Sequence, residues 1–134
     1  MNLAGRVLEK KILILSTDDK ECEDLGKVLE TRGYNLITAN TLPDIEHHFH
    51  KHHCLLALLD LDSVKLDNRT IRQVTLENPG LYLLALSREL YHPELKDSIS
   101  CHIYACINKP MNPEELFYLI ESIYRQEEDP NRQS

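Results

Sequence analysis

Residues 54–60, Cys-Leu-Leu-Ala-Leu-Leu-Asp, form the most hydrophobic run of the chain, and the run ends abruptly at an acidic residue. A short, continuously apolar run of this kind is typical of a strand that is covered on both faces. Such strands occur in parallel sheets, because crossover helices lie against both sides of the sheet. The run therefore predicts a central strand, Cys54–Leu59, with Asp60 just beyond its end.

Four further apolar runs alternate with segments that have helical spacing or helix start signals. The start signals are Thr41-Leu-Pro-Asp44 and Asn112-Pro-Glu-Glu115, which resemble capping boxes with proline in the first turn. Strict alternation of strands and helices predicts a single α/β domain with a parallel sheet and helices on both faces. The four additional strands are expected at Ile12–Leu15, Tyr34–Ala39, Leu81–Leu86 and Ile103–Ile107.

Length and charge narrow the class of protein. The 134 residues fit one domain, expected at 11–126 between an N-terminal extension, 1–10, and a polar tail, 127–134. The 15 basic and 22 acidic residues give a net charge of −7, which argues against direct contact with nucleic acid. The sequence has no apolar segment of signal-peptide or membrane-spanning length, so we expect a cytoplasmic protein without membrane contact.

Candidate functional residues follow four of the five expected strands. They are Ser16-Thr17-Asp18-Asp19 after the first strand, Asp60 after the third, Ser87 after the fourth and Asn108-Lys109-Pro110 after the fifth. Because functional groups of open parallel sheets gather beyond the carboxyl ends of the strands, we expect these side chains to meet at one edge. A carboxylate, a hydroxyl and an ammonium group would then share one cleft.

This set resembles the receiver domain of response regulators in two-component signalling, the CheY-like family. The resemblance rests on the Leu-Leu-Asp that ends at Asp60, on Ser87, on Lys109-Pro110 and on their order and spacing. Asp67 matches a common acidic residue of the family in the loop after Asp60. The similarity spans about residues 11–126, and it implies a flavodoxin-like, doubly wound sheet with strand order 2-1-3-4-5.

The resemblance also implies a signalling role rather than an enzymatic one. Asp60 would accept a phosphoryl group from a sensor histidine kinase or a phosphotransfer protein. Lys109 would hold a phosphoryl oxygen, and the Ser87 hydroxyl would couple modification to loop position. The family usually has a cis bond at the place of Lys109-Pro110. An attached output domain, a separate partner protein and a homodimer are all compatible with this interpretation.

The sequence departs from the family at the metal site and on the fifth strand. Receivers carry two acidic residues directly after the first strand that bind Mg²⁺, and Ser16 and Thr17 stand there in this chain. Mg²⁺ would then depend on Asp60, on Asp18 and on Asp62, whose position contributes its backbone carbonyl in the family. A shift of the alignment by two residues would instead place Asp18 and Asp19 at the acidic positions.

On the fifth strand, Cys106 occupies the place of the family's switch aromatic. Tyr104 is expected on the same face by strand alternation. Tyr104 is then either a displaced switch or ordinary packing.

Three alternatives to a phosphoacceptor stay open. The first is a pseudo-receiver that acts as a protein-interaction module without phosphorylation, which Ser16, Thr17 and Cys106 favour. The second is a metal- or pH-responsive element in the cluster at 47–53, where His48 and His52 have helical i,i+4 spacing. The third is a flavodoxin-like cofactor binder, which the absence of a glycine-rich phosphate loop after the first strand disfavours.

Overall fold

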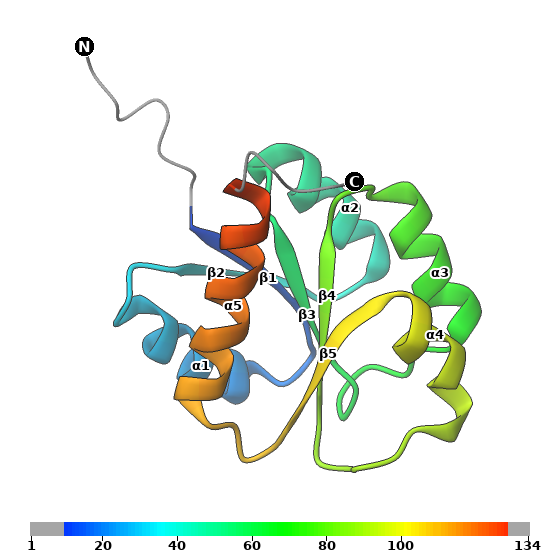
Figure 1. Cartoon of the computed structure of the whole chain (residues 1–134). Helices are drawn as coiled ribbons and strands as arrows, with labels where there is room; N and C mark the ends of the chain where they lie inside the picture. The colour runs from blue at the N-terminus through cyan, green and yellow to red at the C-terminus, as the bar shows by residue number, and fades with distance from the viewer. Residues whose placement is uncertain (1–9, 129–134) are drawn as a thin grey trace.

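The computed structural model describes residues 10–128, which form one five-stranded parallel sheet covered by helices on both faces (Figure 1). The strand order is β2-β1-β3-β4-β5, so the predicted doubly wound, flavodoxin-like architecture is confirmed. A 3-10 turn at Pro93–Leu95 leads into the fourth helix. The elements are β1 (Lys11–Leu15), α1 (Asp19–Glu30), β2 (Asn35–Ala39), α2 (Leu42–His52), β3 (Leu56–Asp60), α3 (Asn68–Glu77), β4 (Tyr82–Ser87), α4 (Lys96–Cys101), β5 (Ile103–Asn108) and α5 (Pro113–Glu128).

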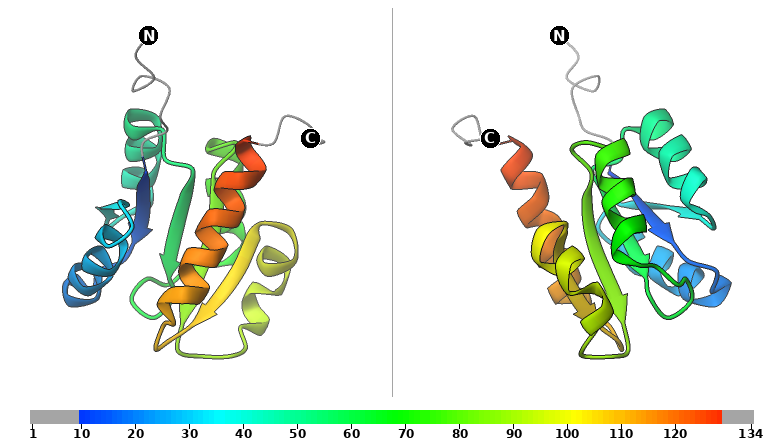
Figure 2. Two further views of the ribbon diagram at one scale, coloured as in Figure 1. Left: turned by 60° about the vertical axis from the view of Figure 1, so that its left-hand side comes forward. Right: turned by 90° about the vertical axis from the view of Figure 1, so that its right-hand side faces the viewer.

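The side chains of β1 explain why both faces of the sheet are covered. Ile12 and Ile14 belong to the core cluster that includes residues of α1 and α5, and Leu13 and Leu15 belong to the cluster of α2 and α3. Successive strand side chains point to opposite faces, so a continuously apolar strand needs a helix layer on each side. Figure 2 shows these two layers, with α1 and α5 on one face and α2, α3 and α4 on the other.

Two helix starts follow the predicted capping signals, and a third has a cap that was not predicted from the sequence. Thr41 Oγ1 accepts a hydrogen bond of 3.4 Å from the Asp44 N–H, and α2 begins directly after Thr41, at Leu42. Asn112 Oδ1 accepts a 2.9 Å hydrogen bond from the Glu114 N–H just before α5. Asp67 caps α3 through a 2.8 Å hydrogen bond from the Thr70 N–H. These caps satisfy N–H groups that the first helical turn leaves without backbone partners.

Several boundaries differ from the expected ones by one or two residues. Asp60 and Ser87 are the last residues of β3 and β4, because they pair with Leu86 and Asn108 in the parallel ladders. Backbone pairing of this kind continues past the last apolar side chain of each strand. The sequence pattern shows only where the apolar side chains end, so it places the ends of these two strands one residue too early. The helix α5 continues to Glu128, past the expected domain end at 126.

The described residues leave out parts of both expected outer segments. Of the expected extension at 1–10, residues 1–9 lie outside the described residues, and so do residues 129–134 of the expected tail. The backbone carbonyl of Lys10 accepts a 2.7 Å hydrogen bond from the Asn35 N–H, which ties this residue to the start of β2. Within 10–128, none of the helices combines the length and apolarity needed to cross a membrane.

The strand β5 contains a β-bulge at Tyr104. Leu83 pairs with Ile103 and the next residue pairs with Ala105, so Tyr104 is an extra residue in the ladder. The Tyr104 ring packs against Tyr82 at 5.6 Å between centroids, and its hydroxyl oxygen accepts a 3.5 Å hydrogen bond from Gln126 of α5.

Cys106, in contrast, lines a cavity beside α4. The expectation that Tyr104 and Cys106 share a face is therefore wrong, because the bulge interrupts the alternation.

Candidate functional site

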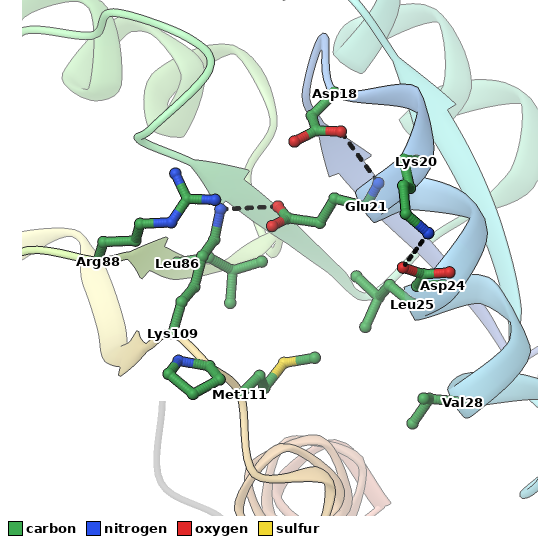
Figure 3. A pocket seen from close by; sticks show the side chains of 11 residues that line it. Asp18, Lys20, Glu21, Asp24, Leu25, Val28, Leu86, Arg88, Lys109 and Met111 are labelled. Atoms are coloured by element: carbon green, nitrogen blue, oxygen red, sulfur yellow. Dashed lines mark hydrogen bonds and ion pairs between the residues drawn. The ribbon is translucent and has the colours of Figure 1, made fainter.

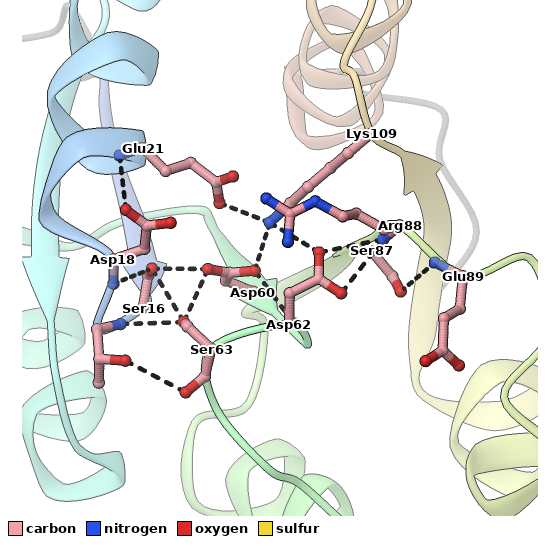
Figure 4. Close-up of polar contacts among 11 residues, drawn as sticks. Ser16, Asp18, Glu21, Asp60, Asp62, Ser63, Ser87, Arg88, Glu89 and Lys109 are labelled. Carbon is pink, nitrogen blue, oxygen red and sulfur yellow. Dashed lines mark hydrogen bonds and ion pairs between the residues drawn. The ribbon is translucent and has the colours of Figure 1, made fainter.

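The carboxyl ends of four strands place polar residues at one edge of the sheet (Figure 4). Ser16 directly follows β1, Asp60 ends β3, Ser87 ends β4 and Lys109 directly follows β5. Because the strands are parallel and in register, these residues lie at the same level of the sheet. The tertiary structure thus brings Asp60 and Lys109 together, with 2.7 Å between Oδ1 and Nζ.

The Asp60 carboxylate is covered, and both of its oxygens accept hydrogen bonds. Oδ1 accepts from Lys109 Nζ at 2.7 Å and from the Asp62 N–H at 3.2 Å. Oδ2 accepts from the hydroxyls of Ser16 at 2.8 Å and Ser63 at 2.7 Å. Asp60 is 0% exposed to solvent. A buried carboxylate is stable only when its charge and lone pairs are satisfied, and this one is satisfied within the chain.

The ammonium group of Lys109 contacts three carboxylates. Its Nζ lies 2.7 Å from Oδ1 of Asp60, 2.7 Å from Oε1 of Glu21 and 3.0 Å from Oδ2 of Asp62. A lysine ammonium has three N–H donors, so these ion pairs can use all of them. The bond between Lys109 and Pro110 is cis. Lys109 therefore joins β3, α1 and the loop after β3 to the start of the β5–α5 loop.

Burial and hydrogen bonding act in opposite directions on the pKa values of this cluster. Burial raises the pKa of Asp60, but hydrogen bonds from Lys109, Ser63 and Ser16 outweigh it and lower the pKa to about 2. Burial lowers the pKa of Lys109, but its contacts with Asp60, Glu21 and Asp62 raise it above its ordinary value. Asp60 is therefore ionised and Lys109 is charged at neutral pH.

Glu21 differs from the other acids of the cluster. Burial raises the pKa of its carboxyl group, and the negative charge of Asp60 raises it further, although Lys109 partly opposes both effects. Asp62 behaves in the other way. Burial raises its pKa, but hydrogen bonds from Lys109 and from the Arg88 N–H lower the pKa overall. The cluster thus carries more carboxylates than ammonium groups, and Glu21 is its most easily protonated member.

The loops after β1 and β3 are held together above Asp60. The Thr17 N–H donates to Ser63 Oγ at 3.0 Å, and Thr17 Oγ1 donates to the Ser63 carbonyl at 3.2 Å. The hydroxyls of Ser16 and Ser63 lie 3.1 Å apart. Ser16 and Thr17 therefore stand directly after β1, as expected, and their hydroxyls bind the β3–α3 loop.

The remaining predicted site residues have other partners. Asp18 caps α1, with Oδ1 accepting from the Glu21 N–H at 3.0 Å, and Asp19 begins that helix. The carboxylate of Asp62 accepts the Arg88 N–H, at 3.1 Å for Oδ2. Ser87 Oγ accepts a 3.0 Å hydrogen bond from the Glu89 N–H and does not contact Asp60. The alternative alignment, which moves Asp18 and Asp19 to the acidic positions, is wrong because β1 ends at Leu15 and Ser16 and Thr17 directly follow it.

Two members of the cluster were not predicted from the sequence, namely Glu21 and Ser63. Glu21 follows Asp18 at capping-box spacing, a pattern in which the glutamate usually returns to the cap residue's own N–H. Here the Asp18 N–H donates to Ser16 Oγ instead, and Glu21 pairs with Lys109. Ser63 lies three residues after Asp60, close enough for a local side-chain contact. The sequence shows the spacing of Glu21 from Asp18 and of Ser63 from Asp60. It does not show that Glu21 pairs with Lys109 or that Ser63 donates to Asp60.

A cavity of about 720 Å³ opens beside Lys109, between α1 and the β5–α5 loop (Figure 3). Glu21, Lys109 and Arg88 are among its polar residues, and Leu25 and Met111 are among its apolar residues. Asp60 does not line this cavity, which agrees with its complete burial. Within the described chain, the Arg88 guanidinium has no hydrogen-bond or ion-pair partner.

The histidine cluster forms a row of rings on α2. The His48 and His52 rings stack at 5.6 Å between centroids, and the His47 ring lies 5.2 Å from that of His48. Lys11 Nζ lies 3.3 Å from Nδ1 of His52, which places a cation beside this ring. Within residues 10–128, no group of three or more histidine, cysteine or acidic residues is arranged to hold a metal ion. Metal or pH sensing by this cluster stays a prediction.

Comparisons with known proteins are informative at the level of structure. No protein-family model and no curated protein matches the sequence. A CheY-like response regulator receiver domain protein from Methanospirillum hungatei JF-1 has a TM-score of 0.74 at 24% identity, over 89% of this chain and 97% of that chain. A two-component response regulator from Clostridium difficile has a TM-score of 0.76 at 17% identity, over 90% and 99%. This chain has the fold of a CheY-like receiver domain.

The same fold also occurs in a protein that is described as a pilus assembly protein and not as a response regulator. A putative pilus assembly protein from Burkholderia thailandensis E264 has a TM-score of 0.70 at 17% identity, over 86% of this chain and 98% of that chain. The fold therefore does not by itself select one use of the residues at the sheet edge.

The receiver resemblance implies a Mg²⁺ ion, and the side chains present do not fit one as they are arranged. Mg²⁺ requires near-octahedral oxygen ligands and usually depends on carboxylates. Ser16 supplies a hydroxyl that is bonded to Asp60, and the Asp18 carboxylate caps α1. Asp60 and Asp62 are both paired with the Lys109 ammonium. Mg²⁺ binding at Asp60, Asp18 and Asp62 stays a prediction, and it would require these contacts to break.

Proposed function

We propose that this chain is a receiver-type protein-interaction module that works without phosphorylation of Asp60. One observation carries the proposal, namely that Asp60 is 0% exposed and accepts four hydrogen bonds from its own chain. A phosphoacceptor must reach its phosphodonor with a free carboxylate oxygen. In this site, an attacking oxygen would first have to lose Ser16 and Ser63, or Lys109 and the Asp62 N–H.

The charge of the site supports the same proposal. An incoming phosphoryl group is anionic, and its transfer needs cationic compensation that is set up in advance. Lys109 is the cation of the cluster, and Glu21, Asp60 and Asp62 already surround it. A phosphoryl oxygen would compete with two further carboxylates for the same ammonium. The Glu21, Asp60 and Asp62 carboxylates thus already use the charge of the Lys109 ammonium, which leaves little of it to compensate an incoming phosphoryl group.

A second candidate function is the phosphoacceptor that the family resemblance implies, and the contact between Asp60 and Lys109 favours it. In that reaction, an Asp60 oxygen bonds to phosphorus while the P–N bond of a kinase or phosphotransfer histidine breaks. The imidazole nitrogen keeps the electron pair of that bond and takes up a proton. The phosphoryl group remains on Asp60 as an acyl phosphate, and Lys109 would turn from Glu21 and Asp62 to hold it.

Incubation with acetyl phosphate and Mg²⁺, followed by intact-mass measurement, separates the two candidates. The interaction module predicts no phosphoryl adduct under conditions in which a working receiver is fully labelled. It also predicts an unchanged amide NMR spectrum in beryllofluoride with Mg²⁺. An adduct that Asp60→Asn abolishes would reject the module and support the phosphoacceptor.

Interaction itself is tested with Asp60→Asn. This variant keeps the shape of the residue but removes its reactivity. The module predicts that tagged wild-type and Asp60→Asn chains retain the same proteins from the cells that make this chain. Selective loss of these proteins by the folded variant would contradict the proposal.

A further inference from the structure

The strand β2 is an outer strand of the sheet, and its outer edge is unprotected. In the described sheet β1 is its only neighbour, and the five residues of β2 pair with β1 without a register shift. Natural proteins usually blunt an exposed sheet edge with a bulge, a proline or a lysine. The other outer strand, β5, has such a bulge at Tyr104, whereas β2 has none of these features. The edge of β2 is therefore open to pairing with another strand.

The backbone of β2 directs two of its residues away from β1. The Asn35 N–H donates to the Lys10 carbonyl at 2.7 Å, so position 35 bonds on the β1 side. In a parallel ladder, successive residues of a strand bond to opposite sides. The N–H and C=O groups of Leu36 and Thr38 therefore point outward, and no described residue bonds to them. An added strand would pair with these two residues.

A groove of about 660 Å³ lies beside this edge, between α1 and β2, and Gly26 lines it together with Leu36. Gly26 stands inside α1, where glycine weakens a helix relative to alanine. A Cβ atom at Gly26 would meet only Leu36, at 3.9 Å, so the described chain has room for alanine at this position. A glycine is useful where a second backbone approaches closely. Gly26 is therefore explained if another chain segment lies in the groove.

The charges around the groove favour a basic occupant. Asp19, Glu23 and Glu30 contribute carboxylates, and Lys27 contributes an ammonium group. Lys27 lies 3.3 Å from Glu23, and no described cation pairs with Asp19 or Glu30. A second copy of this chain would bring the same carboxylates together if it paired through β2, so like charges would oppose that arrangement. A segment with lysine or arginine side chains would instead be attracted.

From these features we infer that the outer edge of β2 binds an extended, basic segment of a partner protein. The segment would add a strand to the sheet through the backbone of Leu36 and Thr38, and alternate side chains would enter the groove over Gly26. The inference does not depend on how Asp60 is used, because β2 contributes no residue to the cluster around that carboxylate.

Titration of the full chain with a synthetic peptide, acetyl-Lys-Val-Lys-Val-Lys-Val-Lys-amide, followed by amide NMR, tests the inference. We expect saturable shifts at Gly26, Leu36 and Thr38. The same peptide with every backbone amide N-methylated keeps its charge but cannot donate to β2, so it should bind at least about tenfold more weakly. The analogue with glutamate in place of lysine should not bind, because its charge matches that of the groove.

Thr38→Pro and Thr38→Val form a matched pair of variants. Proline removes the outward N–H and leaves the ladder with β1 intact, since proline is tolerated on edge strands where the N–H faces solvent. Valine removes the hydroxyl but keeps the N–H. Peptide affinity should fall at least about tenfold in Thr38→Pro and stay unchanged in Thr38→Val.

Gly26→Ala is an independent variant that serves even if Thr38→Pro does not fold. It should raise the melting temperature, because alanine favours the helix, and weaken peptide binding, because its methyl group narrows the groove. Any of four results would overturn the inference. They are equal binding of the peptide and its N-methylated analogue, equal affinities of the two Thr38 variants, unchanged affinity in Gly26→Ala, and a wild-type dimer that Thr38→Pro separates, since a second copy would then occupy the edge.

Discussion

The hydroxyl of Ser16 donates a 2.8 Å hydrogen bond to Oδ2 of Asp60, so the residue after β1 closes over the carboxylate that ends β3. An acidic residue in the place of Ser16 would repel Asp60 unless a cation lay between them. The serine needs no cation, because it supplies a hydrogen-bond donor directly. This one contact links the sequence departure from the receiver pattern to the burial of Asp60.

Acid should destabilise the fold partly through Asp60. Its pKa is about 2 in the folded chain, below the ordinary 3.8, so the ionised form stabilises the fold above pH 4. That stability is lost as the pH falls from 4 towards 2, and it amounts to about 2 kcal/mol. Urea unfolding between pH 2 and 5, followed by circular dichroism, measures the decline.

Asp60→Asn supplies the comparison for the acid measurement. Its free energy of unfolding should fall less steeply over the same pH range, because residue 60 no longer titrates. Asp62 also has a lowered pKa and remains in the variant, so some of the decline should persist. Identical slopes in the two proteins would show that Asp60 does not contribute.

Ser63→Ala should destabilise the fold by about 1–3 kcal/mol, because it removes a donor from a buried, charged carboxylate. The pKa of Asp60 should rise as well, since Ser63 is one of the groups that lower it. Urea unfolding at pH 7 gives the first quantity. Ser100→Ala is the control, because that hydroxyl is exposed and donates only to the Lys96 carbonyl. Equal effects of the two substitutions would contradict the importance of Ser63.

Restoring the acidic pair should create a response to Mg²⁺. The double variant Ser16→Asp, Thr17→Asp places two carboxylates beside Asp60, so like-charge repulsion should lower its melting temperature in EDTA. Added Mg²⁺ should raise that temperature by neutralising the site. The wild-type chain should melt at the same temperature in Mg²⁺ and in EDTA. Stabilisation of the wild type by millimolar Mg²⁺, removed by Asp60→Asn, would contradict this prediction.

Asn68→Ala should loosen α4. Asn68 donates to the Glu94 carbonyl at 2.9 Å, and its Oδ1 accepts from the N–H and the hydroxyl of Ser98 at 3.0 and 2.6 Å. Removing these bonds leaves the buried Ser98 hydroxyl without its partner, at a cost of about 1–3 kcal/mol. Amide hydrogen exchange should accelerate over 93–101 more than over α1. Uniform acceleration across the chain would indicate global destabilisation instead.

The fold was largely predictable because its signals are local and repeated. Continuously apolar runs such as that of β3 follow from burial on two faces, and Thr41 and Asn112 cap helices through contacts within three residues. The bulge at Tyr104 was not predictable, since it depends on how β5 registers against β4. A single extra residue moved that ring from the α4 side to the α5 side.

The amino-acid order alone was enough to place Asp60, Ser87 and Lys109 at the ends of strands, because period, polarity and helix capping are properties of neighbouring residues. It was also enough to show hydroxyls where the receiver pattern has acids. The partners of those groups were set by folding. Glu21 reaches Lys109 from another element, and Ser16 and Ser63 cover Asp60 together. Such contacts join residues more than forty positions apart in some cases, and only packing in three dimensions selects among the donors and acceptors that the strand ends bring within reach.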